Sequence, residues 1–79
     1  MLKLRIVSPE KVVFDGEVES VKVPGMLGEF EILNDHAPII SSLVTGNVTY
    51  TSKEGSNTLP VNGGFVEVKK NEVCLCVEV

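Results

Sequence analysis

The sequence predicts an all-β domain, and three observations support this class. Val, Ile, Thr, Phe and Tyr make up 26 of the 79 residues, whereas Ala occurs once. β-Branched and aromatic side chains favour strands, while helices depend on residues such as Ala, Leu and Glu. Short alternating runs are interrupted by turn residues at close spacing. This pattern is typical of a sandwich or barrel, and no segment reads as a helix of ordinary length.

The first half of the chain predicts four strands. Residues 1–7 alternate between apolar and charged side chains, which indicates one buried and one wet face. Asp15-Gly16 is a hairpin signal, and Pro24-Gly25 breaks the chain after the third strand. We expect strands over residues 1–7, 11–14, 17–23 and 29–33.

The second half continues in short strands. Residues 34–38 form a polar loop, and residues 53–57 are expected as the loop of a hairpin. Gly63-Gly64 indicates a bulge or sharp bend, because glycine permits positive φ and close chain approach. We expect strands over residues 39–44, 48–52, 58–61, 66–68 and 73–79.

Alternation also predicts the core. A chain of 79 residues is one small domain at most, so we treat residues 1–79 as a single unit. Most of the following apolar residues, which have polar neighbours, are expected to face inward: Leu4, Ile6, Phe30, Ile32, Val66, Val68, Val73, Leu75 and Val77.

Charge and hydropathy exclude two classes of ligand. Seven Lys and Arg against eleven Asp and Glu give a net charge of −4. Nucleic acid is a poor partner for this chain, because phosphate binding requires a basic face. No apolar run approaches the roughly 20 residues that cross a bilayer, so we expect no direct insertion into lipid. No signal peptide is visible.

The residues that could carry chemistry are few. Cys74 and Cys76 point the same way in a strand pattern, which is poor disulfide geometry, so two reduced structural thiols are expected. His36 is the single histidine and lies in no nucleophile or metal motif. The pairs Glu17/Glu19 and Glu29/Glu31 fit solvated strand faces. We expect no catalytic residue, cofactor or metal, and therefore a function in partner binding.

The order of motifs resembles the epsilon subunit of the F-type, proton-translocating ATP synthase. The most diagnostic stretch is residues 28–38, GEFEILNDHAP. The other matching stretches are IVSPE at 6–10, VFDGEV at 13–18, VPG at 23–25, LVTGNV at 43–48 and GGFVEV at 63–68. The resemblance covers nearly the whole chain.

The resemblance implies a flattened β-sandwich of about ten short strands in the rotating central stalk. Such a subunit is non-catalytic, binds the gamma subunit, and meets the polar loops of the c-ring. It is peripheral, at the cytoplasmic face of the bacterial inner membrane. The resemblance assigns Ser8 to the gamma-facing side, and Glu29 and His36 to the c-ring contact. A gamma-binding face that is apolar also predicts self-association of the isolated domain in crystals.

The usual family member continues into a helical hairpin that inhibits ATP hydrolysis, and the sequence stops at Val79 before it. We therefore expect coupling without an inhibitory arm. Two alternatives remain at this stage. One is a lipoyl or biotinyl carrier module modified at Lys53, which lies at a hairpin tip but lacks the usual Met neighbour. The other is an enzyme that uses His36 as its base.

Overall fold

The computed structural model describes residues 1–79 and contains nine strands and no helix, which confirms the all-β class. The strand number is nine, where the resemblance implied about ten. The strands are β1 (Leu2–Val7), β2 (Val12–Val18), β3 (Ser20–Gly25), β4 (Gly28–Ile32), β5 (Ile39–Leu43), β6 (Gly46–Ser52), β7 (Gly55–Val61), β8 (Gly63–Lys69) and β9 (Glu72–Glu78).

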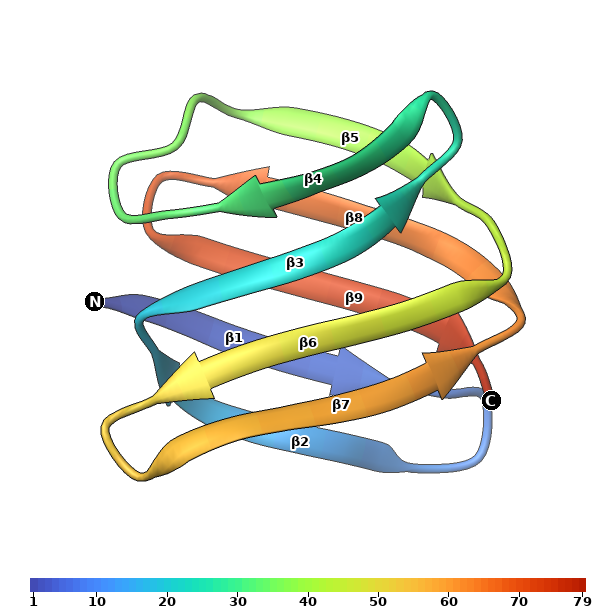
Figure 1. The fold of residues 1–79 in the computed structure, drawn as a ribbon, viewed down its shortest axis with the longest axis horizontal. Helices are drawn as coiled ribbons and strands as arrows, with labels where there is room; N and C mark the ends of the chain where they lie inside the picture. The colour runs from blue at the N-terminus through green and yellow to red at the C-terminus, as the bar shows by residue number, and fades with distance from the viewer.

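The strands form one sheet that curls over on itself. Its order is β2-β1-β9-β8-β5-β3-β6-β7, and β4 pairs with β3 outside this path. All pairs are antiparallel except β1 with β9, which run parallel. Figure 1 shows β3, β6 and β7 lying across β8, β9 and β1, so that the curled sheet makes two layers. The inner faces of these layers enclose the core.

The core is a single cluster of Leu, Ile and Val side chains, with no buried polar or charged residue. Eight of the nine residues expected inside are buried. Phe30 is the exception, because it lies on β4, is only partly buried and packs against the edge of the cluster. The cluster comprises Leu2, Leu4, Ile6, Val18, Val21, Val23, Ile32, Leu43, Val48, Val61, Val66, Val68, Val73, Leu75 and Val77.

The hairpin expected at Asp15-Gly16 is wrong, since β2 continues through both residues to Val18. Gly16 is paired with Leu4 on β1, and a Cβ there would lie 3.1 Å from the Phe14 ring. The glycine therefore makes room for an aromatic side chain inside a strand. The chain instead leaves β2 at Glu19, whose backbone N–H donates a hydrogen bond to the Thr51 carbonyl at 2.7 Å.

The loop expected over residues 53–57 is also shorter than predicted. β6 ends at Ser52 and β7 begins at Gly55, which leaves a two-residue turn. Gly55 has a φ of 126°, a conformation that glycine adopts without strain. Gly63 and Gly64 both have positive φ, as glycine permits, but β8 pairs with β9 through both residues without a register shift, so no bulge is present there.

Candidate interaction surfaces

One outer face of the sheet carries apolar side chains across neighbouring strands. Phe65 on β8 is opposite Cys76 on β9, and Cys76 is opposite Val7 on β1. Val7 is in turn opposite Val12 on β2. Ile40 on β5 is opposite Glu67 on β8, which faces outward like Phe65 two residues earlier. Ile40 therefore points to the same outer side as Phe65, in the next row of paired residues. We call Val7, Val12, Ile40, Phe65 and Cys76 the outer apolar band.

The band is open to solvent. Ile40 is 71% exposed, Val12 49% and Phe65 45%, while Val7 and Cys76 are half-buried. Strand alternation explains this position, because the inward phase of each strand is already filled by core residues. Contiguous exposed apolar side chains are typical of surfaces that contact another molecule. Sequence reasoning missed this band, although apolar residues in the outward phase of alternating strands were its visible signal.

Ser8 lies at the edge of this band. It follows Val7 directly and forms a tight turn with Lys11, with backbone hydrogen bonds in both directions at 2.9 and 3.3 Å. Its hydroxyl also donates to the Lys11 carbonyl at 3.3 Å. Ser8 is half-buried, so the turn holds it in place while leaving it accessible.

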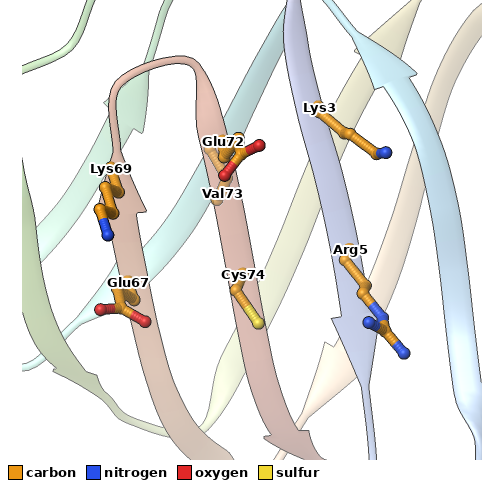
Figure 2. A pocket seen from close by; sticks show the side chains of 7 residues that line it. All are labelled: Lys3, Arg5, Glu67, Lys69, Glu72, Val73 and Cys74. Atoms are coloured by element: carbon orange, nitrogen blue, oxygen red, sulfur yellow. The ribbon is translucent and has the colours of Figure 1, made fainter.

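The rest of the same outer face is charged and lines a shallow pocket, shown in Figure 2. Opposite charges face one another across the strands, as in Arg5 with Asp15 and Lys69 with Glu72. Such cross-strand pairs stabilise a sheet modestly. Because positive and negative side chains are mixed in the lining, the pocket has no strong charge of one sign that would attract an ionic ligand. The pocket is lined by Lys3, Arg5, Glu67, Lys69, Glu72, Val73 and Cys74.

The two cysteines lie on this outer face and are half-buried. Burial raises the pKa of the Cys74 thiol, and Cys76 raises it further by charge and by a side-chain hydrogen bond. The positive charge of Arg5 acts in the opposite direction, and Glu67 adds a smaller upward effect. Cys74 is therefore a protonated thiol at neutral pH.

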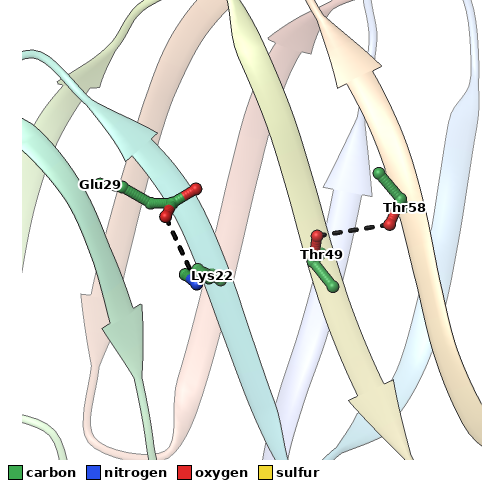
Figure 3. A network of polar contacts seen from close by, with 4 residues as sticks. All are labelled: Lys22, Glu29, Thr49 and Thr58. Atoms are coloured by element: carbon green, nitrogen blue, oxygen red, sulfur yellow. Dashed lines mark hydrogen bonds and ion pairs between the residues drawn. The ribbon is translucent and has the colours of Figure 1, made fainter.

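Glu29 lies on the outer face of the other layer, near the start of β4. Its carboxylate is 3.4 Å from the Lys22 ammonium, and both side chains are about half exposed. Figure 3 shows this pair beside Thr49 and Thr58, whose hydroxyls are 3.4 Å apart. Solvent screens such a surface ion pair, so it is worth less than about 1 kcal/mol and Glu29 remains available to a partner. Glu31, Glu17 and Glu19 are exposed as expected.

His36 lies in the loop that follows β4. Its Nδ1 is 2.7 Å from the Ala37 carbonyl, and the ring is half-buried. The neighbouring Asp35 has a φ of 62°, and its backbone N–H donates a 2.8 Å hydrogen bond to the Asn71 side-chain oxygen. The loop is therefore tied to the turn between β8 and β9. Glu29 therefore lies near the first residue of β4, and His36 lies in the loop beyond its last residue.

The turn between β3 and β4, close to Glu29, carries two exposed apolar residues. Leu27 is fully exposed and Met26 is 64% exposed. The Met26 backbone N–H donates to the Ser42 carbonyl at 3.1 Å, so the turn is fixed against β5. The sequence predicted only a chain break at the neighbouring Pro24-Gly25.

The structure places no three His, Cys, Asp or Glu side chains close enough to hold a metal ion together. Lys53 lies in the exposed turn between β6 and β7. No helix is present that is long and apolar enough to cross a bilayer.

Comparison with known proteins identifies the relatives of this chain. The family model of the ATP synthase delta/epsilon chain β-sandwich domain matches residues 1–79. The ATP synthase epsilon chain of Leptospira interrogans is 42% identical over 77 residues, covering 98% of this chain and 61% of that protein. That of Chlorobium limicola is also 42% identical, covering 96% of this chain and 88% of that protein. This chain thus spans about three-fifths of the Leptospira relative.

Solved structures share the fold. A chain in the mitochondrial ATP synthase of Euglena gracilis superimposes with a TM-score of 0.90 at 19% identity, covering 96% of this chain and 49% of that chain. A chain in the central stalk and c-ring structure of the Tetrahymena thermophila mitochondrial ATP synthase gives a TM-score of 0.83 at 20% identity, covering 99% and 63%. Neither the carrier module nor the enzyme alternative has support among these relatives.

Proposed function

Because the chain belongs to the ATP synthase delta/epsilon β-sandwich family, we propose that it is a non-catalytic rotor subunit that joins the gamma subunit to the c-ring. The observation that carries this proposal is the outer apolar band, an exposed surface on a chain matched by the family over all 79 residues. In this role the domain transmits torque between proton translocation and ATP synthesis. It works at the cytoplasmic face of the bacterial inner membrane as a peripheral component.

The outer apolar band is the proposed gamma-binding face, with Ser8 at its border. Apolar side chains such as Ile40 and Phe65 gain free energy when a partner removes them from water, at about 25 cal/mol for each Å² buried. The charged rows beside the band provide the polar rim that interfaces usually have.

A binding experiment with matched variants tests this face. We expect Phe65→Glu to weaken binding of the chain to a gamma subunit from the same source by at least about tenfold, since a buried unpaired charge costs more than 1.4 kcal/mol. Thr58→Glu is the control, because Thr58 is exposed on β7 in the other layer. Equal affinities of the two variants would exclude the band as the gamma site.

Cross-linking gives an independent measurement for Ser8. A Ser8→Cys variant should form a cross-link to gamma in the assembled enzyme when a short bifunctional reagent is added. Both variants carry Cys74→Ser and Cys76→Ser, because the native thiols lie on the same outer face, and in this background the reagent should give no cross-link with Thr58→Cys. Cross-linking at position 58 but never at position 8 would place gamma on the wrong layer and refute the assignment.

Strand β4 and the loop after it, which carry Glu29 and His36, form the proposed c-ring contact. Both residues are polar, accessible and held by local contacts, to Lys22 and Ala37 respectively. A polar contact of this kind is screened by salt, so it orients the rotor and contributes little to its affinity.

A double variant tests the c-ring contact. We expect Glu29→Ala combined with His36→Ala to reduce proton pumping per ATP hydrolysed, with gamma binding retained. Glu31→Ala is the matched control, because Glu31 is exposed on the same face of β4 as Glu29. Coupling that is unchanged in the double variant would show that both side chains are simply solvated.

We further propose that residues 1–79 act as one β-sandwich unit that supports coupling and does not itself inhibit ATP hydrolysis. The sandwich contains no helix and its longest projections are short turns, so it cannot reach far along gamma. Adding the purified chain to epsilon-depleted catalytic sectors should leave ATPase activity nearly unchanged. Strong inhibition that a turn substitution abolishes would reveal an inhibitory element within the sandwich.

A further inference from the structure

The two thiols of β9 form a pair on one surface. Cys74 and Cys76 are separated by Leu75, which points into the core and is fully buried. Both cysteines therefore project to the outer face, and both are half-exposed. Figure 2 shows Cys74 on this face between β8 and β1.

The spacing of the two cysteines prevents a disulfide bond between them but allows a metal ion to bind between their sulfurs. Two residues along a strand span about 6.6–6.8 Å, and side chains on the same face are roughly parallel. The Cβ atoms of a disulfide must be about 3.5–4.5 Å apart, so the folded strand prevents that bond. A metal ion held linearly between two sulfurs, with bonds of about 2.3 Å, needs sulfurs about 4.6 Å apart. The strand spacing exceeds this distance by about 2 Å, so each sulfur must lean about 1 Å toward the other to hold the ion.

We propose that Cys74 and Cys76 form a two-coordinate site for a soft monovalent metal ion of the copper(I) class. Thiolates are the ligands that copper(I) prefers, and no third His, Cys, Asp or Glu completes a site for a metal that needs more ligands. Two sulfur–metal bonds form, and the two thiol protons are released to solvent.

The surroundings of the pair suit this complex. Phe65 on β8 and Val7 on β1 flank Cys76 and place apolar side chains on both sides of it. The dithiolate complex of a monovalent ion carries one negative charge, and Arg5 lies directly opposite Cys74. Glu67, opposite Cys74 on the other side, works against this charge. Cys76 also contributes to the raised pKa of the Cys74 thiol, in keeping with two thiols on one face of the strand.

Copper(I) itself is the probe for the site. The 79-residue chain is titrated without oxygen against a coloured copper(I) chelator, and we expect one ion per chain. Cys74→Ser and Cys76→Ser should each weaken binding by at least about 100-fold, a loss that even an outer-shell partner can cause. X-ray absorption should show two sulfur ligands. This test needs no gamma subunit or c-ring, so its outcome is separate from that of the proposed function.

A relocated pair provides the positive control. Glu72 is exposed on the same face of β9, two residues before Cys74. The double variant Glu72→Cys, Cys76→Ser should therefore restore one tightly bound ion per chain, whereas Cys76→Ser alone should not. A strand-type circular dichroism spectrum shows that each variant is folded. The site is refuted if either serine variant keeps wild-type affinity, if two ions bind per chain, or if copper only bridges two chains.

Discussion

The start of β8 shows how single residues set the geometry of this fold. Gly64 has a φ of 135° and is opposite Val77 on β9. A Cβ at this position would lie 2.8 Å from the Val77 Cα and closer still to the Cys76 carbonyl oxygen. Gly55 has a similar φ of 126°, but a Cβ there would meet nothing within 4 Å. An added side chain would therefore meet only an unfavourable backbone conformation at Gly55, but both that conformation and a steric clash at Gly64.

Alanine substitutions at these two glycines should differ in their effect on stability. Gly55→Ala should cost about 1–3 kcal/mol, the range for a residue held in an unfavourable backbone conformation. Gly64→Ala should cost more than about 3 kcal/mol, because β8 and β9 must also move apart. Urea denaturation of both variants measures the difference. Equal losses would mean that the sheet absorbs the added methyl group.

The Cys74 thiol gives a second prediction for a single residue. Burial is the largest cause of its raised pKa, and Cys76 is the next. In Cys76→Ser the second cause disappears, so the Cys74 pKa should fall while remaining above its ordinary value. Since only the thiolate reacts with iodoacetamide, the alkylation rate should begin to rise at a lower pH than in the wild type. An unchanged or upward-shifted profile would contradict the attribution to Cys76.

Alternation was a good guide to which residues are buried, with one informative exception. Phe30 has the inward phase and packs against the core cluster, but it is only partly buried, whereas Ile32 on the same strand is fully buried. A period of two tells which face a side chain takes, and it does not tell whether another element covers that face. The sequence could therefore predict Ile32 and Phe30 as inward residues without distinguishing their burial.

At the scale of elements, β4 should tolerate loss of its aromatic side chain better than loss of its aliphatic one. Ile32 is fully buried, so Ile32→Ala should cost about 2–5 kcal/mol. Phe30→Ala should cost less, about 1–2 kcal/mol, because part of the ring already contacts water. Leu33→Ala, at a site 51% exposed, is the control and should cost less than about 0.5 kcal/mol. A larger loss for Phe30 than for Ile32 would reverse this ordering.

The element boundaries show where turn signals mislead. Asp15-Gly16 has the composition of a hairpin turn, yet Asp15 pairs with Arg5 and Gly16 with Leu4 inside β2. The real break at Glu19 contains neither glycine nor proline. The break exists because β2 pairs with β1, whereas the next strand, β3, pairs with β6. This change of partner involves residues far apart in the sequence, so a local pattern does not encode it.

At the scale of the whole molecule, the sequence predicted the all-β class, but it did not predict the order in which the strands pair. The parallel pairing of β1 with β9 joins the two ends of the chain, and no local signal specifies it. The outer apolar band depends on this pairing. Val7 and Cys76 become neighbours only because β1 lies beside β9, so the surface could not be assembled from single strands. The assignments of Ser8, Glu29 and His36 rested on resemblance, and they remain predictions.

The exposed band leads to a prediction about the isolated chain. Without a partner, two copies should associate through this face, weakly and reversibly, because it offers only a few partly exposed apolar side chains, whereas a stable interface buries about 800 Å² per partner. Each copy carries a net charge of −4, so repulsion opposes the contact at low salt. Raising the salt concentration screens this repulsion, since the Debye length falls from about 10 Å at 0.1 M to about 3 Å at 1 M.

Self-association should therefore increase with salt, which is opposite to the behaviour of a polar contact such as that proposed for Glu29. Sedimentation equilibrium at several protein and salt concentrations measures this directly. Phe65→Glu should remain monomeric under all of these conditions, whereas Thr58→Glu, on the other layer, should associate like the wild type. If gamma binds the same face, adding gamma should dissociate the dimers of the chain and produce complexes of one chain with one gamma subunit. A wild-type chain that stays monomeric in 1 M salt at high concentration would show that the band does not drive association by itself.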